Sequence, residues 1–395
     1  MSMADCISID ADALVDLAGR LVRIPSVNPP GDYSAISDVL RREMEAIGLE
    51  TAILEGQPGK PNVLGLLRAA DAGARTILLS GHMDVVGPGD LSGWGFDPFS
   101  ATVADGCLWG RGAVDMKGAI AAELAAVSAV MKTAGRLPVN VMLGATVDDE
   151  TAGDMGQKYV LEAGLAGAGW PRPGLHILGE ANSLNITGAF KGRIWLRVAV
   201  RGRTAHGGAP QEGVNAIDAL VEYVRRLRAR PSARHPLVGA DTLNLGTLRG
   251  GTRVNAVADE CEAELDFRFG TVPAAEAEQG LRQVMERLHE EDPSFAVHEF
   301  RVFEKRDPVN VDPAASDVRI IAGAIARVTG REPGFLGTLS AGDAYHSLRQ
   351  GIPAAWVGPG DACLMHAPNE RIGLDELVLA AKVYASIILA WAGVP

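Results

Sequence analysis

Histidine and acidic side chains recur in this sequence directly after apolar runs. His82 and Asp84 follow "TILLSG", and the triplet Asp148, Asp149 and Glu150 follows "LPVNVMLGATV". Three adjacent carboxylates repel one another, and they lose solvation when they are buried. The triplet therefore indicates either a solvated loop or a site that binds cations.

Three further candidates occupy similar places. Glu180 follows "LHILG", His366 comes a short loop after "IPAAWVGPG", and Asp115 lies in the Gly-rich turn "GRGAVDMKG" that opens a long helix. Ligands gather at the carboxyl ends of strands in α/β sheets, so one shared site is expected. Imidazole and carboxylate are the usual non-thiolate ligands of zinc-type metals. More than three acids favour two ions with a bridging carboxylate, a role open to Asp115.

Each of these residues taken alone has a structural explanation. A histidine at the end of a buried strand is more often a satisfied structural residue than a ligand. An acid in a strand-to-helix loop, such as Asp115, is more often a helix N-cap. Separate caps have no reason to gather at one edge, so the clustering favours the metal site.

The segments that carry these residues alternate between helix and strand patterns before about Thr187, which implies an α/β sheet with parallel strands. Helices are predicted over 10–24, 33–48 and 114–135, and strands over 61–68, 75–86, 137–148 and 175–180.

The pattern after Thr187 changes to β-α-β-β-α-β, the order of a ferredoxin-like unit. Its strands are predicted over 190–202, 241–251, 256–269 and 294–303, and its helices over 213–229 and 274–292. The α/β pattern resumes from about Lys305, with a helix over 316–330, a strand over 352–360 and a helix over 374–393.

We therefore expect an α/β protein with one discontinuous domain, residues 1–186 and 305–395, whose sheet is mixed but largely parallel. Residues 187–304 form an inserted α+β domain. With 395 residues, the chain is long enough for both domains.

Charge and cysteine content narrow the partners and the compartment. The net charge of −12, without a long basic run, argues against nucleic acid and anionic membranes as partners. The four cysteines are scattered without a CxxC pair, which favours free thiols in the cytoplasm. The N-terminus lacks an apolar core, so no signal peptide is expected, and no apolar run is long enough to cross a bilayer.

Seven motifs in order resemble the M20 family of co-catalytic zinc peptidases and deacylases, which includes acetylornithine deacetylase, succinyl-diaminopimelate desuccinylase, aminoacylase and glutamate carboxypeptidase. The resemblance covers essentially the whole chain, and the inserted unit resembles the family's lid and dimerisation domain. The motifs are "SGHMDVV", "WGFDPF", "LWGRGAVDMKG", the acidic triplet, "ILGEAN", "RTAHGGAP" and "HAPNE".

The resemblance implies two Zn²⁺ ions per subunit, with Co²⁺ or Mn²⁺ as alternatives, and a cis peptide after Asp115. Asp84 is expected to lie behind His82 and orient its ring. The implied ligands are His82 and Glu180 for one ion, Glu150 and His366 for the other, and Asp115 as the bridge between both.

Three residues of the inserted domain also match the family pattern. The resemblance implies that His206 reaches the active site of a neighbouring subunit in a homodimer and stabilises an oxyanion there, and that Asn255 has a similar task. It implies that Arg268 binds a substrate carboxylate, for which a guanidinium fork is suited. Regular alternation around Arg268 leaves a surface strand arginine as the alternative.

Two positions depart from the family pattern. The middle residue of the triplet is normally the glutamate that acts as general base, but here it is Asp149, whose carboxylate reaches about 1.5 Å less far. Proton transfer requires hydrogen-bond reach, so this shift matters. Gly342 precedes Asp343 where relatives usually carry Thr or Ser, in a loop that lines the substrate pocket of relatives.

The predicted function is a metal-dependent amidohydrolase that removes the acyl group of an N-acyl amino acid, with Asp149 as the base. One alternative is an exopeptidase, a dipeptidase or carboxypeptidase acting on short peptides with the same site. Another is a non-catalytic member, in which Asp149 marks a lost base.

Overall fold

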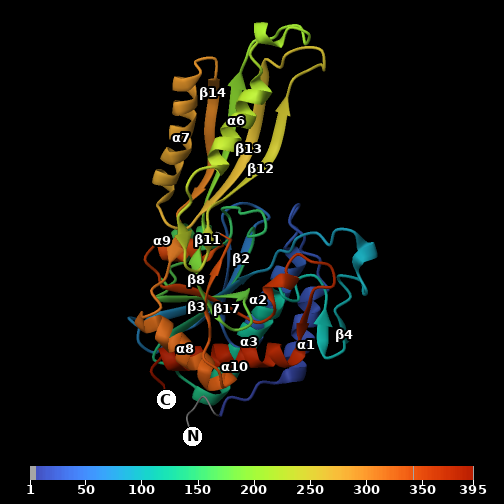
Figure 1. The fold of residues 1–395 in the computed structure, drawn as a ribbon. Helices are drawn as coiled ribbons and strands as arrows, with labels where there is room; N and C mark the ends of the chain where they lie inside the picture. Colours follow the sequence, from blue (N-terminus) through green and yellow to red (C-terminus); the bar gives the residue numbers. More distant parts are fainter. Residues whose placement is uncertain (1–5, 341, 395) are drawn as a thin grey trace. The chain divides into compact units, whose positions relative to one another are not determined.

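The structure is a computed structural model that describes residues 6–340 and 342–394. The chain separates into two compact units (Figure 1). One holds the described residues up to Gly188, Val311–Leu336 and the described residues from Gly342 onward; the other holds Ala189–Asn310 and the short stretch beginning at Gly337. Residues 1–5, part of the segment for which no signal peptide is expected, lie outside the described residues.

The main sheet of the described chain has nine strands in the order β1-β2-β6-β3-β7-β17-β8-β15, with β16 paired to β8. The four central strands, β6, β3, β7 and β17, pair in parallel. The flanking pairs β1-β2, β2-β6, β17-β8 and β8-β15 are antiparallel, so the sheet is mixed and its parallel part lies at the centre. The strands are β1 (Glu50–Glu55), β2 (Pro61–Leu67), β3 (Thr76–His82), β6 (Asn140–Thr146), β7 (Leu175–Ala181), β8 (Ile186–Phe190), β15 (Val309–Asn310), β16 (Phe335–Thr338) and β17 (Ala354–Gly358).

Helices on both faces bury the central strands, whose residues are buried throughout. Successive side chains of β3 point to opposite faces, so Ile77 and Leu79 join one core cluster while Leu78 joins another. The larger cluster includes α1 (Ala11–Val22), α2 (Ser34–Ala46), α3 (Lys117–Ala134), α8 (Ser316–Thr329) and α10 (Leu374–Trp391). The smaller one includes the helical segment formed by α4 (Gln157–Tyr159), a π turn (Val160–Gly164) and α5 (Leu165–Gly167).

A small three-stranded sheet in the order β18-β5-β4 joins distant parts of the chain. In it, Arg371 pairs with Trp109, which brings the "HAPNE" segment next to the Gly-rich turn. Its strands are β4 (Thr102–Ala104), β5 (Cys107–Trp109) and β18 (Arg371–Gly373). The short helix α9 (Ala344–Arg349) precedes β17.

The second unit has an antiparallel sheet in the order β12-β13-β9-β14, with α6 and α7 packed on one face (Figure 1). Alternate residues of β13 are buried under these helices, as the period of a half-covered strand requires. The elements are β9 (Gly192–Arg201), α6 (Ala216–Arg228), the β10 (Arg234–His235) and β11 (Gly239–Ala240) hairpin, β12 (Thr242–Gly250), β13 (Glu260–Phe269), α7 (Ala274–Glu291) and β14 (Ala296–Arg306).

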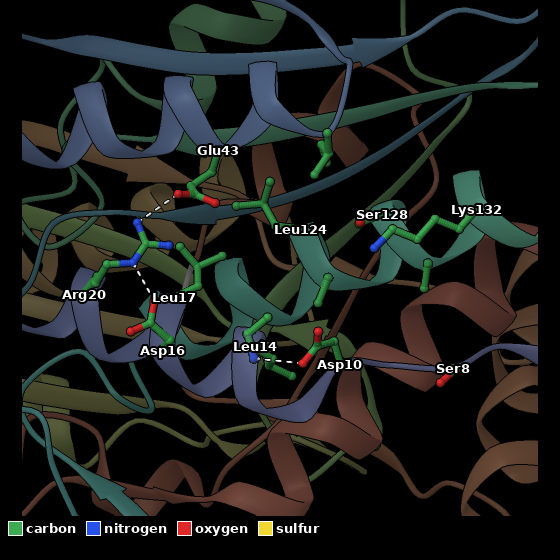
Figure 2. Close-up of a pocket in the computed structure, with 14 residues that line it drawn as sticks. Ser8, Asp10, Leu14, Asp16, Leu17, Arg20, Glu43, Leu124, Ser128 and Lys132 are labelled. Atoms are coloured by element: carbon green, nitrogen blue, oxygen red, sulfur yellow. Dashed lines mark hydrogen bonds and ion pairs between the residues drawn. The ribbon is translucent and has the colours of Figure 1, made fainter.

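One pocket of about 590 Å³ opens between α1, α2 and α3 (Figure 2). Leu14 and Leu124 contribute to its apolar lining, and Arg20 binds both Asp16 and Glu43 at its rim. None of the predicted site residues lines this pocket. In the part of the chain that the structure describes, no helix is long and apolar enough to cross a membrane.

Candidate metal centre

The predicted ligands come together at the carboxyl ends of the parallel strands. His82 is the last residue of β3, and Glu180 lies next to the last residue of β7. Glu150 follows β6, and Asp115 lies in the turn before α3. His366 comes from the loop after β17 with a backbone φ of 61°, in the left-handed region that non-glycine residues seldom adopt.

Asp115 lies between the two histidines. Its Oδ1 is 3.0 Å from Nε2 of His82, and its Oδ2 is 3.1 Å from Nε2 of His366. Glu180 Oε1 is 3.4 Å from His82 Nε2, and Glu150 Oε2 is 3.1 Å from His366 Nε2. Each histidine thus has one acid of its own and shares Asp115, the arrangement that a two-ion site with one bridge requires. The peptide bond Asp115–Met116 is cis, which confirms that expectation.

Asp149 lies at the edge of the ligand cluster. Its Oδ2 is 3.9 Å from Nε2 of His82, and its side chain is 23 % exposed. Ligand atoms of His82, Asp149 and Glu180 all lie within 4.8 Å of one another, as do those of His82, Asp115 and Glu150. The shorter side chain therefore still reaches the site.

The contacts of Asp84 with His82 and with the acidic triplet differ from the expected arrangement. Its backbone carbonyl oxygen, 2.9 Å from Nδ1 of His82, is the group placed to accept the ring N–H, whereas its carboxylate Oδ1 is 3.7 Å away. The carboxylate Oδ2 accepts hydrogen bonds from Asn28 Nδ2 (2.9 Å) and from the backbone N–H of Glu150 (3.2 Å). The buried Asp84 side chain thus fixes the acidic triplet, and its backbone orients His82.

Two residues that the sequence motifs did not identify support the first acid of the triplet. Lys60 Nζ is 2.5 Å from Oδ1 of Asp148, and Asn28 Nδ2 donates to the same oxygen over 3.3 Å. Asn28 also donates to Thr151 Oγ1. The dipeptide Pro29–Pro30 directly after Asn28 marks a rigid turn and was an available signal, but nothing in the sequence near Lys60 marks its role.

The predicted lid residues lie in the second unit. His206 forms an isolated bridge with Ala256, and the backbone N–H of Gly207 donates to the carbonyl of Asn255 over 2.8 Å. His206 and Asn255 therefore come from adjoining exposed loops. Arg268 on β13 already donates through Nε and Nη2 to the two carboxylate oxygens of Asp266, over 2.7 and 2.9 Å.

Residues 78–390 match the model of peptidase family M20/M25/M40. The chain belongs to this family. It is 31% identical over 389 residues to a succinyl-diaminopimelate desuccinylase of Caulobacter sp. (strain K31), covering 97% of this chain and 96% of that protein.

Solved structures share the fold. The M20 family metallo-carboxypeptidase Sso-CP2 from Sulfolobus solfataricus has a TM-score of 0.77 at 18% identity, with 96% of this chain and 99% of that chain covered. The Bacillus subtilis YXEP protein, described as a dinuclear metal-binding M20 peptidase, has a TM-score of 0.73 at 16% identity, with 98% and 99% covered. This M20 protein is therefore a metal-dependent hydrolase.

The donor set of this M20 hydrolase fits divalent cations. Its oxygens include the buried Oε2 of Glu180, which has no hydrogen-bond partner among the described residues. Burial raises the pKa of Glu180 to about 7, and the nearby Asp115 adds to the shift. Cations beside Glu180 would favour its charged form.

The two imidazoles of the M20 site have pKa values above the usual range of histidine. Hydrogen bonds to Asp115 and Glu150 raise the pKa of His366 to about 10. Burial lowers the pKa of His82, but hydrogen bonds to Asp115 and Glu180 outweigh it and the pKa lies well above the usual value. Because a metal takes neutral imidazole, metal binding and protonation compete for these two rings.

Proposed function

We propose that this M20 hydrolase binds a pair of zinc ions and removes the acyl group of N-acyl amino acids. The observation that carries the proposal is Asp115, whose two oxygens face His82 and His366 separately. Glu180 on the His82 side and Glu150 on the His366 side complete the proposed ligand set. The bound ions would supply Lewis-acid polarisation of the scissile carbonyl and a water of lowered pKa.

Asp149 is the proposed general base. It accepts a proton as the water oxygen bonds to the acyl carbon, and it returns that proton to the amine nitrogen as the C–N bond breaks. Its partly exposed carboxylate at the edge of the ligand cluster supports this role, because the group remains accessible to water and substrate. The 3.9 Å separation from His82 supports sufficient reach for an aspartate.

Arg268 is the proposed partner of the substrate carboxylate. A planar guanidinium binds a carboxylate through two parallel hydrogen bonds, the geometry that it already forms with Asp266. The desuccinylase similar to this chain supports a deacylase, whereas the peptidases among the solved structures support the fold alone.

A homodimer is also proposed, in which His206 and Asn255 contribute to the partner's site and stabilise the oxyanion. β12 is an edge of the second unit's sheet, and unpaired edge strands provide main-chain groups for pairing. Val221 on α6 is 48 % exposed and Leu248 on β12 is 41 % exposed, which adds apolar surface on the same unit. The cytoplasm is the proposed compartment, because all four cysteines are free.

The test combines metal analysis with assays on N-acetyl and N-succinyl amino acids and on dipeptides, before and after chelation. We expect two equivalents of metal, activity on acylated amino acids, loss of activity on chelation and recovery on addition of Zn²⁺. Activity that survives complete metal removal would overturn the mechanism. Preferential cleavage of dipeptides would replace the deacylase with an exopeptidase.

A further inference from the structure

A buried ion pair lies beside the proposed metal site and has no part in the mechanism above. Arg111 Nη1 is 2.6 Å from Oε2 of Glu370, and the two side chains are only 2 % and 0 % exposed. Arg111 belongs to the "LWGRGAVDMKG" motif, and Glu370 ends the "HAPNE" motif. The pair therefore joins the two segments that carry Asp115 and His366.

Glu370 organises the turn that presents Asp115. Its Oε1 accepts hydrogen bonds from three backbone N–H groups, those of Gly112 (3.0 Å), Val114 (2.8 Å) and Asp115 itself (3.0 Å). Gly112 has a φ of 89°, a conformation that favours glycine. Because glycine restricts the backbone little, the turn does not hold its own conformation. A single carboxylate oxygen thus fixes the backbone from which the bridging side chain projects.

Arg111 organises the loop that presents His366. Its Nη2 donates to the carbonyl of His366 over 3.3 Å, and its Nη1 donates to the carbonyl of Ala367 over 3.2 Å. The guanidinium carbon also lies 5.1 Å from the centre of the Trp94 ring, within the "WGFDPF" motif. The His366 side chain is 53 % exposed, so packing around that side chain constrains it little.

We propose that Arg111 and Glu370 are positioning residues that set the spacing between Asp115 and His366, and hence the binding of the ion held by His366, Asp115 and Glu150. The inference rests on the proposed metal pair. Metal sites require ligands held within about 0.5 Å of their productive geometry. The "HAPNE" motif is far in sequence from the other two motifs, so the ion pair joins segments that the local chain does not hold together.

The competing explanation is a purely structural ion pair, which would affect stability alone. The two explanations differ in the metal affinity of protein that is still folded. Glu370→Gln keeps an oxygen acceptor for the turn but loses the charge that holds Arg111, whereas Glu370→Ala loses both. Arg111→Lys keeps the charge but loses the planar fork that reaches two carbonyls.

Asn140→Ala is the matched control for destabilisation. Asn140 is a buried polar residue at the start of β6, where it bonds the backbone of Ala69 and Ala74 and the hydroxyl of Thr76. The start of β6 is the opposite end of the strand from the acidic triplet. This variant should lower the melting temperature without altering metal affinity.

The experiment titrates Zn²⁺ and Co²⁺ into metal-free wild type and each variant in competition with a chromophoric chelator, and records melting temperatures without metal. We expect affinity for one of the two ions to fall about 10–100-fold in Glu370→Ala and Arg111→Lys, the size of effect found for groups that orient ligands. Glu370→Gln should retain part of the metal affinity that Glu370→Ala loses. In the variants with weakened metal binding, kcat should fall more than KM rises.

The experiment distinguishes failure of the proposed function from failure of the positioning role. If wild type binds fewer than two ions, the proposed function itself fails. If wild type binds two ions and folded Glu370→Gln and Arg111→Lys bind both with wild-type affinity, the proposed function stands and the positioning role is overturned. Because these two variants retain polar groups at both positions, the test does not depend on whether Glu370→Ala folds.

Discussion

At the scale of single residues, Asp149 is the proposed general base. We predict that Asp149→Ala lowers kcat about 10²–10⁴-fold, the usual contribution of a general base. Asp149→Glu should retain substantial activity, because it keeps the carboxylate. Metal content must be measured in parallel, since Asp149 also lies near His82. Full activity in Asp149→Ala, with metal intact, would remove the residue from the mechanism.

A second single residue, His176, makes the stability of the protein depend on pH. The ring lies on β7 between the hydroxyls of Ser80 and Ser347, with both nitrogen–oxygen distances at 2.6 Å. Burial lowers its pKa from 6.5 to about 3. The unfolded chain therefore binds the proton more readily, and the stability contributed by neutral His176 is lost as the pH falls from about 6.5 towards 3.

We predict that the free energy of unfolding of wild type falls more steeply over this pH range than that of His176→Gln. Chemical denaturation at several pH values measures both slopes. Both proteins should be studied without metal, so that titration of the metal ligands is common to them. Parallel slopes would show that His176 does not titrate on unfolding.

At the scale of elements, Asn28 connects the loop after β3 with the loop after β6, through Asp84 and Asp148. We predict that Asn28→Ala lowers metal affinity about 10–100-fold, because the triplet and the His82 segment lose a common support. Chelator competition on the metal-free protein measures this effect. Unchanged affinity in a folded variant would make Asn28 a structural residue only.

The elements that could be predicted from sequence are those with strong local patterns. The continuous apolar runs predicted β3, β6 and β7, and residues at or just after the ends of these strands are the proposed ligands, because strand ends determine where side chains gather. β1 and β8 were not predicted: β1 is a half-exposed edge strand that begins and ends in glutamate, and β8 is short and contains glycine.

The supporting residues could not be predicted because their roles depend on contacts across the fold. Lys60 pairs with Asp148, and Arg111 pairs with Glu370, across separations in sequence that no local pattern can indicate. Gly342 is a similar case. A Cβ there would lie 2.1 Å from Cζ2 of Trp356, so the ring leaves no room for the Thr or Ser expected from the family pattern.

At the scale of the whole molecule, the proposed dimer makes each site depend on two chains. A mixed dimer of His206→Ala and Asp149→Ala chains would contain one complete site, because the first chain supplies Asp149 and the second supplies His206. We predict that the two inactive variants, co-refolded in equal amounts, regain about a quarter of wild-type activity, since half of the dimers are mixed and each has one complete site.

Size-exclusion chromatography with light scattering measures whether the wild type and the co-refolded variants are dimers. Separate refolding of each variant before mixing, without exchange, is the control and should give no recovery. A monomeric wild type with full activity would exclude the shared site.

The place of β17 in the sheet has a consequence for synthesis. This strand comes from residues 354–358, yet it lies between β7 and β8, which the ribosome completes far earlier. Nascent chains fold from the N-terminus as domains emerge. β7 and β8 therefore remain without β17 between them until the whole intervening unit has been translated. Until then, the exposed strand edges are open to wrong partners, and a chain released before residue 366 lacks the proposed ligand His366. Retention of metal therefore distinguishes chains that extend beyond residue 366 from chains that end before it.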